Sequence, residues 1–198
     1  MNYEKIVLEL FERVKGLEER VQVLESRDDG DEELDDNRDI LDELNSSEKI
    51  TRSISRKYVM DELKKQNPAF TISKGNRAAK ADILLEFQGK SLKAKFYHSR
   101  SFREFPSGWH TVNKDDLNNN VHVEMYIFTV EYQKEFYTFL FSRSELIDFV
   151  KNKTTDQNNM YHFYFHVNNG KVVEVRDSER DATPFLDNWK LPSKLLGI

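Results

Sequence analysis

The stretch Ala81–His98, with the sequence ADILLEFQGKSLKAKFYH, decides the fold of the C-terminal part of this chain. It contains two runs of alternating apolar and polar side chains, over 81–87 and 91–98, joined by Gln88-Gly89-Lys90. Such alternation is typical of β-strands, and a short polar connection that contains glycine is typical of a tight turn. The stretch therefore predicts a β-hairpin.

Charged side chains gather on one face of this hairpin, because every second residue of a strand points to the same side. That face carries Asp82, Leu84 and Glu86 on the first strand, and Ser91, Lys93, Lys95 and Tyr97 on the second. A carboxylate beside two ammonium groups forms a place where a divalent ion and a phosphate can meet. The alternative is an ordinary cross-strand ion pair between Asp82 and Lys95.

The surrounding sequence predicts an α+β fold with a mixed central sheet flanked by helices. Ser142 and Glu145 have the spacing of a capping box, and Asn168-Asn169-Gly170 is typical of a hairpin turn. Besides the 81–98 hairpin, we expect helices over 50–66, 143–151 and around 184–189, a short strand over 70–73, an irregular segment over 99–120, and hairpins of 121–132 with 135–141 and of 161–167 with 171–176.

The chain divides into three regions of different charge. Its 198 residues hold 30 Lys and Arg against 35 Asp and Glu, a net charge of -5. Residues 28–48 contain eleven acidic residues and one basic residue, a net of -10, whereas residues 1–27 carry -1 and residues 49–198 carry +6. These differences predict an N-terminal arm over 1–27, an acidic linker over 28–48 and a globular domain over 49–198.

The arm has the heptad pattern of a coiled coil. Its apolar side chains recur at alternating spacings of four and three, at Tyr3, Val7, Leu10, Val14, Leu17, Val21 and Leu24. Valine at position a with leucine at position d favours parallel dimers. We therefore expect a homo-oligomer, in the simplest case a parallel dimer, through residues 3–24. The alternative is an amphipathic helix that packs on its own globular domain.

The composition excludes several classes of protein. The chain has no cysteine, which excludes disulfides, thiolate metal sites and a cysteine nucleophile. No apolar run approaches the roughly 20 residues of a membrane helix, so we expect a cytoplasmic protein. The sequence also lacks a glycine-rich phosphate loop and the HExxH and GxSxG motifs, and its five histidines lack a compact metal-ligand spacing.

The order of elements around Asp82 and Lys95 resembles the PD-(D/E)XK nuclease superfamily, which has the restriction-endonuclease-like fold. The resemblance covers residues 50–165 and rests on a helix, a short strand, an Asp-bearing strand, a strand with the x-Lys motif and an aromatic sheet. It implies a metal-dependent DNA endonuclease, in which Asp82 binds Mg²⁺ and Lys95 orients the water that attacks the phosphodiester.

One position departs from the motif of that superfamily. Lys93 stands two residues before Lys95, where the family has an acidic residue or glutamine, and a lysine repels Mg²⁺ rather than binding it. Glu62 on the first helix is the candidate for the missing carboxylate, as a second metal ligand and catalytic residue beside Asp82. Otherwise the domain has lost catalysis and is a module that binds or regulates DNA.

Basic and aromatic residues close to the hairpin are the candidates for contacts with DNA or another nucleic acid. They are Arg77, Lys80, Lys93, Arg100, Arg103 and Trp109. Cations neutralise phosphates irrespective of base sequence, and an aromatic ring can stack on a base. The leading hypothesis is thus a nuclease-like protein that acts on nucleic acid. A coiled-coil scaffold whose globular part binds protein is the remaining alternative.

Overall fold

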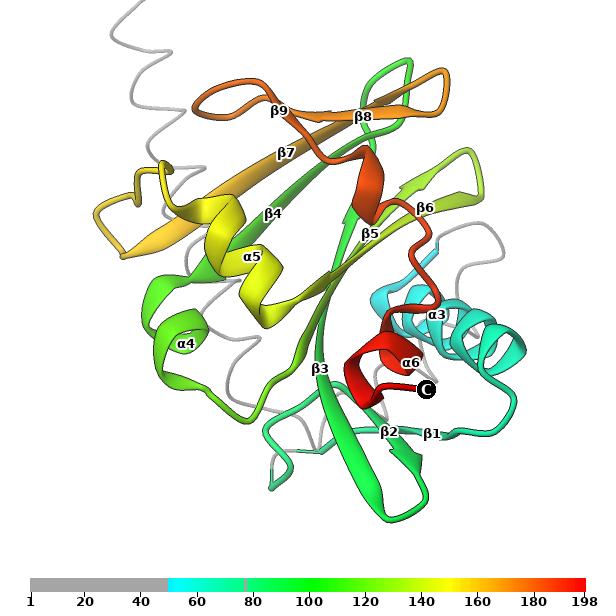
Figure 1. Ribbon diagram of the computed structural model, residues 1–198. Coiled ribbons are helices and arrows are strands. Elements are labelled where there is room, and N and C mark those ends of the chain that lie inside the picture. Colours follow the sequence, from blue (N-terminus) through cyan, green and yellow to red (C-terminus); the bar gives the residue numbers. More distant parts are fainter. Residues whose placement is uncertain (1–49, 77) are drawn as a thin grey trace, which may run out of the picture. The chain divides into compact units, whose positions relative to one another are not determined.

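A computed structural model of the chain describes residues 50–76 and 78–198, and residues 50–198 form one compact unit (Figure 1). The coiled coil predicted over 3–24, the acidic linker predicted over 28–48 and the candidate Arg77 lie outside the described residues. Within the described part, no helix is long and apolar enough to cross a membrane.

A mixed five-stranded sheet forms the centre of the unit. Its strand order is β1-β2-β3-β5-β6, with the bounds Thr71–Lys74, Ile83–Phe87, Lys90–Arg100, Met125–Tyr132 and Glu135–Ser142. Neighbouring strands are antiparallel except β3 and β5, which pair in parallel. The β2–β3 pair is the hairpin expected from residues 81–98, and the predicted α+β fold with a mixed central sheet is confirmed.

A second, antiparallel sheet packs against the central one. Its order is β4-β7-β8-β9, with the bounds Ser107–Asn113, Met160–Asn168, Lys171–Glu174 and Arg180–Asp181. Strand β7 alternates strictly between buried and half-buried residues. One face of this sheet therefore belongs to the core and the other faces outward.

Helices cover both sides of the central sheet. They are α3 (Arg52–Gln66), α4 (Lys114–Asn119), α5 (Arg143–Val150), the short 3-10 helix η1 (Thr183–Phe185) and α6 (Leu191–Leu196). Figure 1 shows α3 and α6 on one side of the sheet, and the second sheet with α4 and α5 on the other side. The central sheet is thus the middle layer between two hydrophobic cores.

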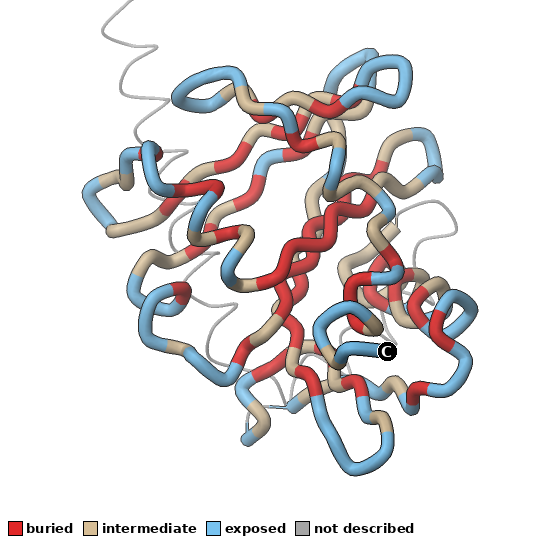
Figure 2. The backbone as a smooth tube through the Cα atoms, in the orientation of Figure 1, coloured by how far each residue is buried: buried red, intermediate tan, exposed pale blue. Residues whose placement is uncertain are grey.

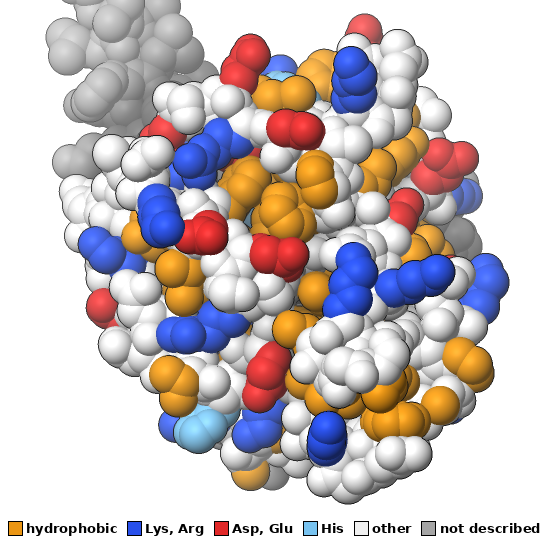
Figure 3. Space-filling view, in the orientation of Figure 1, with side chains coloured by type: hydrophobic (Ala, Val, Ile, Leu, Met, Phe, Trp, Pro, Cys, Tyr) orange, Lys and Arg blue, Asp and Glu red, His pale blue; other side chains and the backbone are white. Residues whose placement is uncertain are grey.

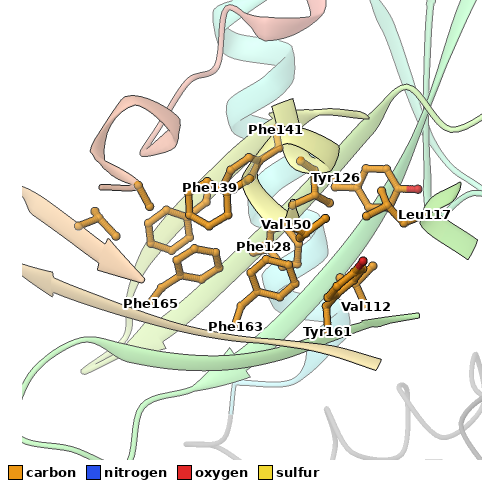
Figure 4. Close-up of a cluster of buried hydrophobic side chains, with 14 of the residues drawn as sticks. Val112, Leu117, Tyr126, Phe128, Phe139, Phe141, Val150, Tyr161, Phe163 and Phe165 are labelled. Atoms are coloured by element: carbon orange, nitrogen blue, oxygen red, sulfur yellow. The ribbon is translucent and has the colours of Figure 1, made fainter. Parts of the chain in front are cut away.

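Strand β5 and the part of β6 from Thr138 onward are buried on both faces, as the continuous buried stretch in Figure 2 shows. Met125 and Ile127 pack in the core beneath α3, whereas Tyr126 and Phe128 pack in the core beneath the second sheet. Phenylalanines dominate this second core (Figure 4). Because each aromatic side chain buries about 150–250 Å², this core is the main hydrophobic contribution to stability.

Local sequence sets where the main helices begin. Thr51 caps α3, because its hydroxyl oxygen accepts a hydrogen bond of 3.3 Å from the backbone N–H of Ile54. The capping box predicted from Ser142 and Glu145 is confirmed: the Ser142 hydroxyl accepts from the Glu145 N–H, and the Glu145 carboxylate accepts from the Ser142 N–H. Each cap satisfies backbone donors that a helix leaves free.

Residues 99–120 are not an irregular segment, contrary to the sequence-based expectation, because they contain β4 and α4. The inward positions of β4 are Gly108, His110 and Val112. Only Val112 has an aliphatic side chain, so the alternation of apolar and polar residues that is typical of a strand is hardly visible in the sequence. Gly108 is required there, because a Cβ atom would lie 2.1 Å from a methyl group of Val130. Contact between the layers, invisible in the sequence, determines this strand.

The helix expected around residues 184–189 is also wrong. Only Thr183–Phe185 form a short 3-10 turn, and the C-terminal helix begins at Leu191. Asp187 adopts a left-handed φ of 49°, which interrupts a helix, and its N–H donates a 2.7 Å hydrogen bond to the Thr138 carbonyl of β6. Docking on the sheet edge therefore prevails over local helix propensity.

We expect acid to destabilise the fold through two histidines, the buried His110 and the partly buried His98. Burial is the largest cause of a lowered pKa at both residues. It lowers the pKa of His110 from 6.5 to about 3 and that of His98 from 6.5 to about 4. Between these values and 6.5 the unfolded chain binds more protons, so the free energy of unfolding falls as pH falls, by up to about 1.4 kcal/mol per pH unit for each histidine. Urea denaturation at a series of pH values measures this slope.

His110→Gln should flatten that slope, whereas His122→Gln, at an exposed position, serves as the matched control. A His110→Gln protein with the slope of the wild type would contradict the assignment.

Candidate functional site

The two faces of β3 carry different residues. Leu92, Ala94 and Phe96 are buried in the core beneath α3, whereas Lys93 and Lys95 are half-buried and point to the opposite face. The expected grouping of charges on one face of the hairpin follows from the register, in which Leu84 pairs with Lys93. The backbone N–H of Asp82 donates to the Ala94 carbonyl at 2.9 Å, although Ala94 already pairs with Ile83, so the regular register ends at Ile83.

Asp82 forms an ion pair with Arg52 of α3, and not the alternative cross-strand pair with Lys95. One carboxylate oxygen accepts a 3.0 Å hydrogen bond from Arg52, and the other accepts a 2.9 Å hydrogen bond from the backbone N–H of Phe96. The Arg52 guanidinium also donates to the Phe96 carbonyl at 3.0 Å. The pair therefore provides hydrogen-bond partners for the backbone N–H and carbonyl of Phe96, at the point where β3 is no longer paired with β2.

Glu62 lies in another part of α3. Its carboxylate forms an ion pair of 3.1 Å with Lys65, one turn further along the helix. Arg52, which reaches Asp82, stands ten residues earlier on the same helix. At a rise of 1.5 Å per residue, this is about 15 Å along the helix axis. The structure thus does not bring Glu62 to Asp82.

These contacts do not fit a bound Mg²⁺ ion. Both oxygens of Asp82 already accept hydrogen bonds, and the Arg52 cation stands 3.0 Å away. Lys93 and Lys95 add two further positive charges on the neighbouring strand. Among the described residues, no group of three His, Asp or Glu side chains is arranged to hold a metal ion. A hard cation needs several free oxygen ligands, so we derive no reaction step through a metal here.

Burial raises the pKa of the Tyr97 hydroxyl, and the carboxylates of Asp82 and Asp116 add to this effect. Sequence reasoning missed Arg52, the ion-pair partner of Asp82. A helical wheel could have found it, because Arg52 lies seven residues before Val59 and therefore on the same, inward side of α3.

Glu124 holds the backbone beside the lysines. Its carboxylate accepts a 2.8 Å hydrogen bond from the Lys93 N–H, and its own N–H donates to the Lys93 carbonyl at 3.0 Å. The ammonium groups are not engaged in this way. Within residues 50–76 and 78–198, no carboxylate forms an ion pair with Lys93 or Lys95.

The other predicted nucleic-acid contacts are distributed around the unit. Lys80 and Arg103 lie on exposed loops. Arg100 is half-exposed and forms a 3.2 Å ion pair with the buried carboxylate of Glu131, so its charge is largely neutralised. Trp109 belongs to β4 in the second sheet and is 46% exposed. The structure therefore brings Lys93 and Lys95 together and places Trp109 on a different sheet.

Comparison with known proteins gives no family assignment. No protein-family model and no curated protein matches the sequence. A solved structure of a bacterial homing endonuclease is similar with 13% identity and a TM-score of 0.45, over 71% of this chain and 86% of that one. The structure of MepB is similar with 15% identity and a TM-score of 0.25, over 48% of this chain and 66% of that one. We therefore base function on the contacts within this chain.

Replacing Asp82 should destabilise the fold. Asp82→Ala leaves the Phe96 N–H and the Arg52 cation without their partner, and we expect a loss of about 1–3 kcal/mol in the free energy of unfolding. Asp82→Asn should lose less, because the amide oxygen still accepts from the Phe96 N–H. Chemical denaturation of the purified variants measures both losses.

Glu62→Ala is the matched control, because it removes a carboxylate from a more exposed ion pair worth less than about 1 kcal/mol. An Asp82→Ala protein as stable as the wild type, or more stable, would contradict the contribution of the Arg52–Asp82 pair to stability.

Proposed function

We propose that this protein binds nucleic acid through a basic surface on β3, here called the β3 surface and consisting of Lys93 and Lys95. The observation that carries the proposal is the pair of ammonium groups on one strand face without a carboxylate partner among the described residues. Two unpaired cations at adjacent positions of a strand face suit successive phosphates of a polyanion.

The charge distribution of the sequence supports this proposal. The globular part, residues 49–198, carries +6, although the whole chain carries -5. A positive domain attracts a polyanion over distances of about a Debye length. Figure 3 shows acidic and basic side chains interspersed on the face with α5 and α6.

Binding without hydrolysis is the form of this function that the geometry favours. The endonuclease hypothesis needs Asp82 and Glu62 to share Mg²⁺ beside Lys95, but Asp82 is bound by Arg52 and Glu62 pairs with Lys65. A lysine at position 93 further disfavours a cation. We therefore propose a DNA-binding or regulatory module, in which the Arg52–Asp82 pair supports the β3 edge and Lys95 contacts phosphate.

The heptad over 3–24 adds an oligomer to this proposal. A parallel dimer would present two copies of the β3 surface to one nucleic acid. Linking two binding modules raises the overall affinity by the effective concentration of the second module. This part of the proposal rests on the sequence pattern alone.

Neutralising the two lysines should weaken binding and reduce its dependence on salt. For B-DNA, each phosphate contact contributes about 0.9 to the slope of log K against log salt concentration, so Lys93→Gln with Lys95→Gln should lower the slope by about 1.8. Fluorescence anisotropy of a labelled duplex, measured over a range of salt concentrations, gives this slope.

Lys57→Gln with Lys190→Gln is the matched control, since both lysines are exposed and belong to the α3 and α6 side of the unit. Equal slopes for the two double variants would contradict a role for the β3 surface. A wild-type protein that binds no duplex at low salt would overturn the proposed function.

Supercoiled plasmid should remain intact when it is incubated with this protein and Mg²⁺ or Mn²⁺, because Asp82 is not free to bind the ion. Gel electrophoresis of the plasmid measures nicking. Metal-dependent nicking that is lost in both Asp82→Ala and Lys95→Ala would overturn binding without hydrolysis and support the endonuclease instead.

A further inference from the structure

The outward face of the second sheet carries a row of aromatic side chains. Phe105, Trp109, His162 and Tyr164, together called the aromatic platform, belong to β4, β7 and the loop before β4. Trp109 pairs in register with Tyr164, so their side chains share one face. The core of the protein lies on the other face, where Phe163 and Phe165 are buried. The platform is thus separate from the hydrophobic core.

Three rings of the platform, those of Trp109, His162 and Tyr164, have nearly parallel planes. The ring centroids of Trp109 and His162 lie 5.9 Å apart with an interplanar angle of 16°, and those of Trp109 and Tyr164 lie 6.1 Å apart with an angle of 9°. The indole N–H of Trp109 also donates a 3.1 Å hydrogen bond to Nδ1 of His162. Donor and acceptor of such a bond lie in their ring planes, so these two rings are side by side rather than stacked.

A chain of hydrogen bonds fixes the orientation of Trp109. An indole N–H can only donate, so Nδ1 of His162 accepts and the proton of this neutral imidazole resides on Nε2. Nε2 lies 2.9 Å from the carboxylate of Asp156, to which it donates. A half-exposed tryptophan is therefore held in one position before any ligand arrives, which reduces the entropic cost of binding.

Cations lie over two rings of the platform. The guanidinium of Arg176 lies 5.7 Å from the ring centroid of Tyr164, and that of Arg103 lies 5.8 Å from the ring centroid of Phe105. Neither guanidinium has a carboxylate within ion-pair distance among the described residues. Flat rings flanked by unpaired cations match a ligand that combines aromatic bases with phosphates.

We infer that the aromatic platform binds single-stranded nucleic acid by stacking unpaired bases on Trp109 and Tyr164, with Arg103 and Arg176 at the phosphates. Every base has an exposed π-face only when it is unpaired and unstacked, so duplex bases cannot use this surface. The inference deepens the proposed function, on which it rests: the β3 surface supplies phosphate contacts alone, whereas the platform specifies the strandedness of the ligand.

The test compares single-stranded and duplex ligands of the full-length protein. Fluorescence anisotropy is measured with labelled oligothymidine and oligouridine of about 12 nucleotides, a length within the usual range of single-strand sites, and with a labelled duplex. Trp109→Ala and Tyr164→Ala should each weaken single-strand binding about tenfold or more, since stacking on one ring contributes that much. Duplex binding should change less than about twofold.

Two further variants separate stacking from loss of fold. Trp109→Phe keeps an aromatic ring and should retain more affinity than Trp109→Ala. Val121→Ala removes an exposed apolar side chain outside the second sheet and should have no effect. Thermal unfolding confirms that each variant is folded at the assay temperature.

The outcomes distinguish this inference from the proposed function. Duplex binding without single-strand binding, or unchanged single-strand binding in both Trp109→Ala and Tyr164→Ala, overturns the platform and leaves the β3 surface standing. Single-strand binding that depends on Trp109, with no effect of Lys93→Gln and Lys95→Gln on duplex, supports the platform and overturns the β3 surface. Binding of neither ligand overturns both.

Discussion

The Arg52–Asp82 pair joins three parts of the chain at the edge of β3. Strand β2 covers β3 only as far as Ala94, so the backbone groups of Phe96 need other partners. The Asp82 carboxylate accepts a hydrogen bond from the Phe96 N–H, and the Arg52 guanidinium donates one to the Phe96 carbonyl. An unpaired buried backbone group costs free energy comparable to a lost hydrogen bond. The pair therefore fixes where α3 lies against the central sheet and where the β2–β3 hairpin can start.

This constraint also changes how the lysines of β3 are interpreted. In the sequence alone, the spacing of Asp82, Lys93 and Lys95 fits a metal and phosphate site and an ordinary ion pair equally well. In the folded chain, the carboxylate is committed to α3 and the ammonium groups are left without a partner among the described residues. The same three side chains thus support phosphate binding better than metal binding, because charge separation leaves two cations on the surface.

Local signals predicted the elements that one segment specifies by itself. The 81–98 hairpin, the capping box at Ser142 and the Asn-Gly turn of β7–β8 depend on neighbours in sequence. Elements that depend on contact between the layers could not be predicted. Strand β4 is an example, because the close approach of Gly108 to Val130 appears only in the folded structure. For the same reason the lysine face was predictable from a period of two, whereas the partner of Asp82 stands 30 residues away on a helix.

The alternation of β7 shows how one strand can serve stability and recognition together. Its inward residues include Phe163 and Phe165, which are apolar, whereas its outward residues include His162 and Tyr164, which have a polar atom on or in the aromatic ring. Core packing alone does not require aromatic rings on the outward side, where a lysine or threonine would be more soluble. If cations on β3 bind phosphates and rings on β7 bind bases, as we propose, the two surfaces contribute independent terms to binding one polymer.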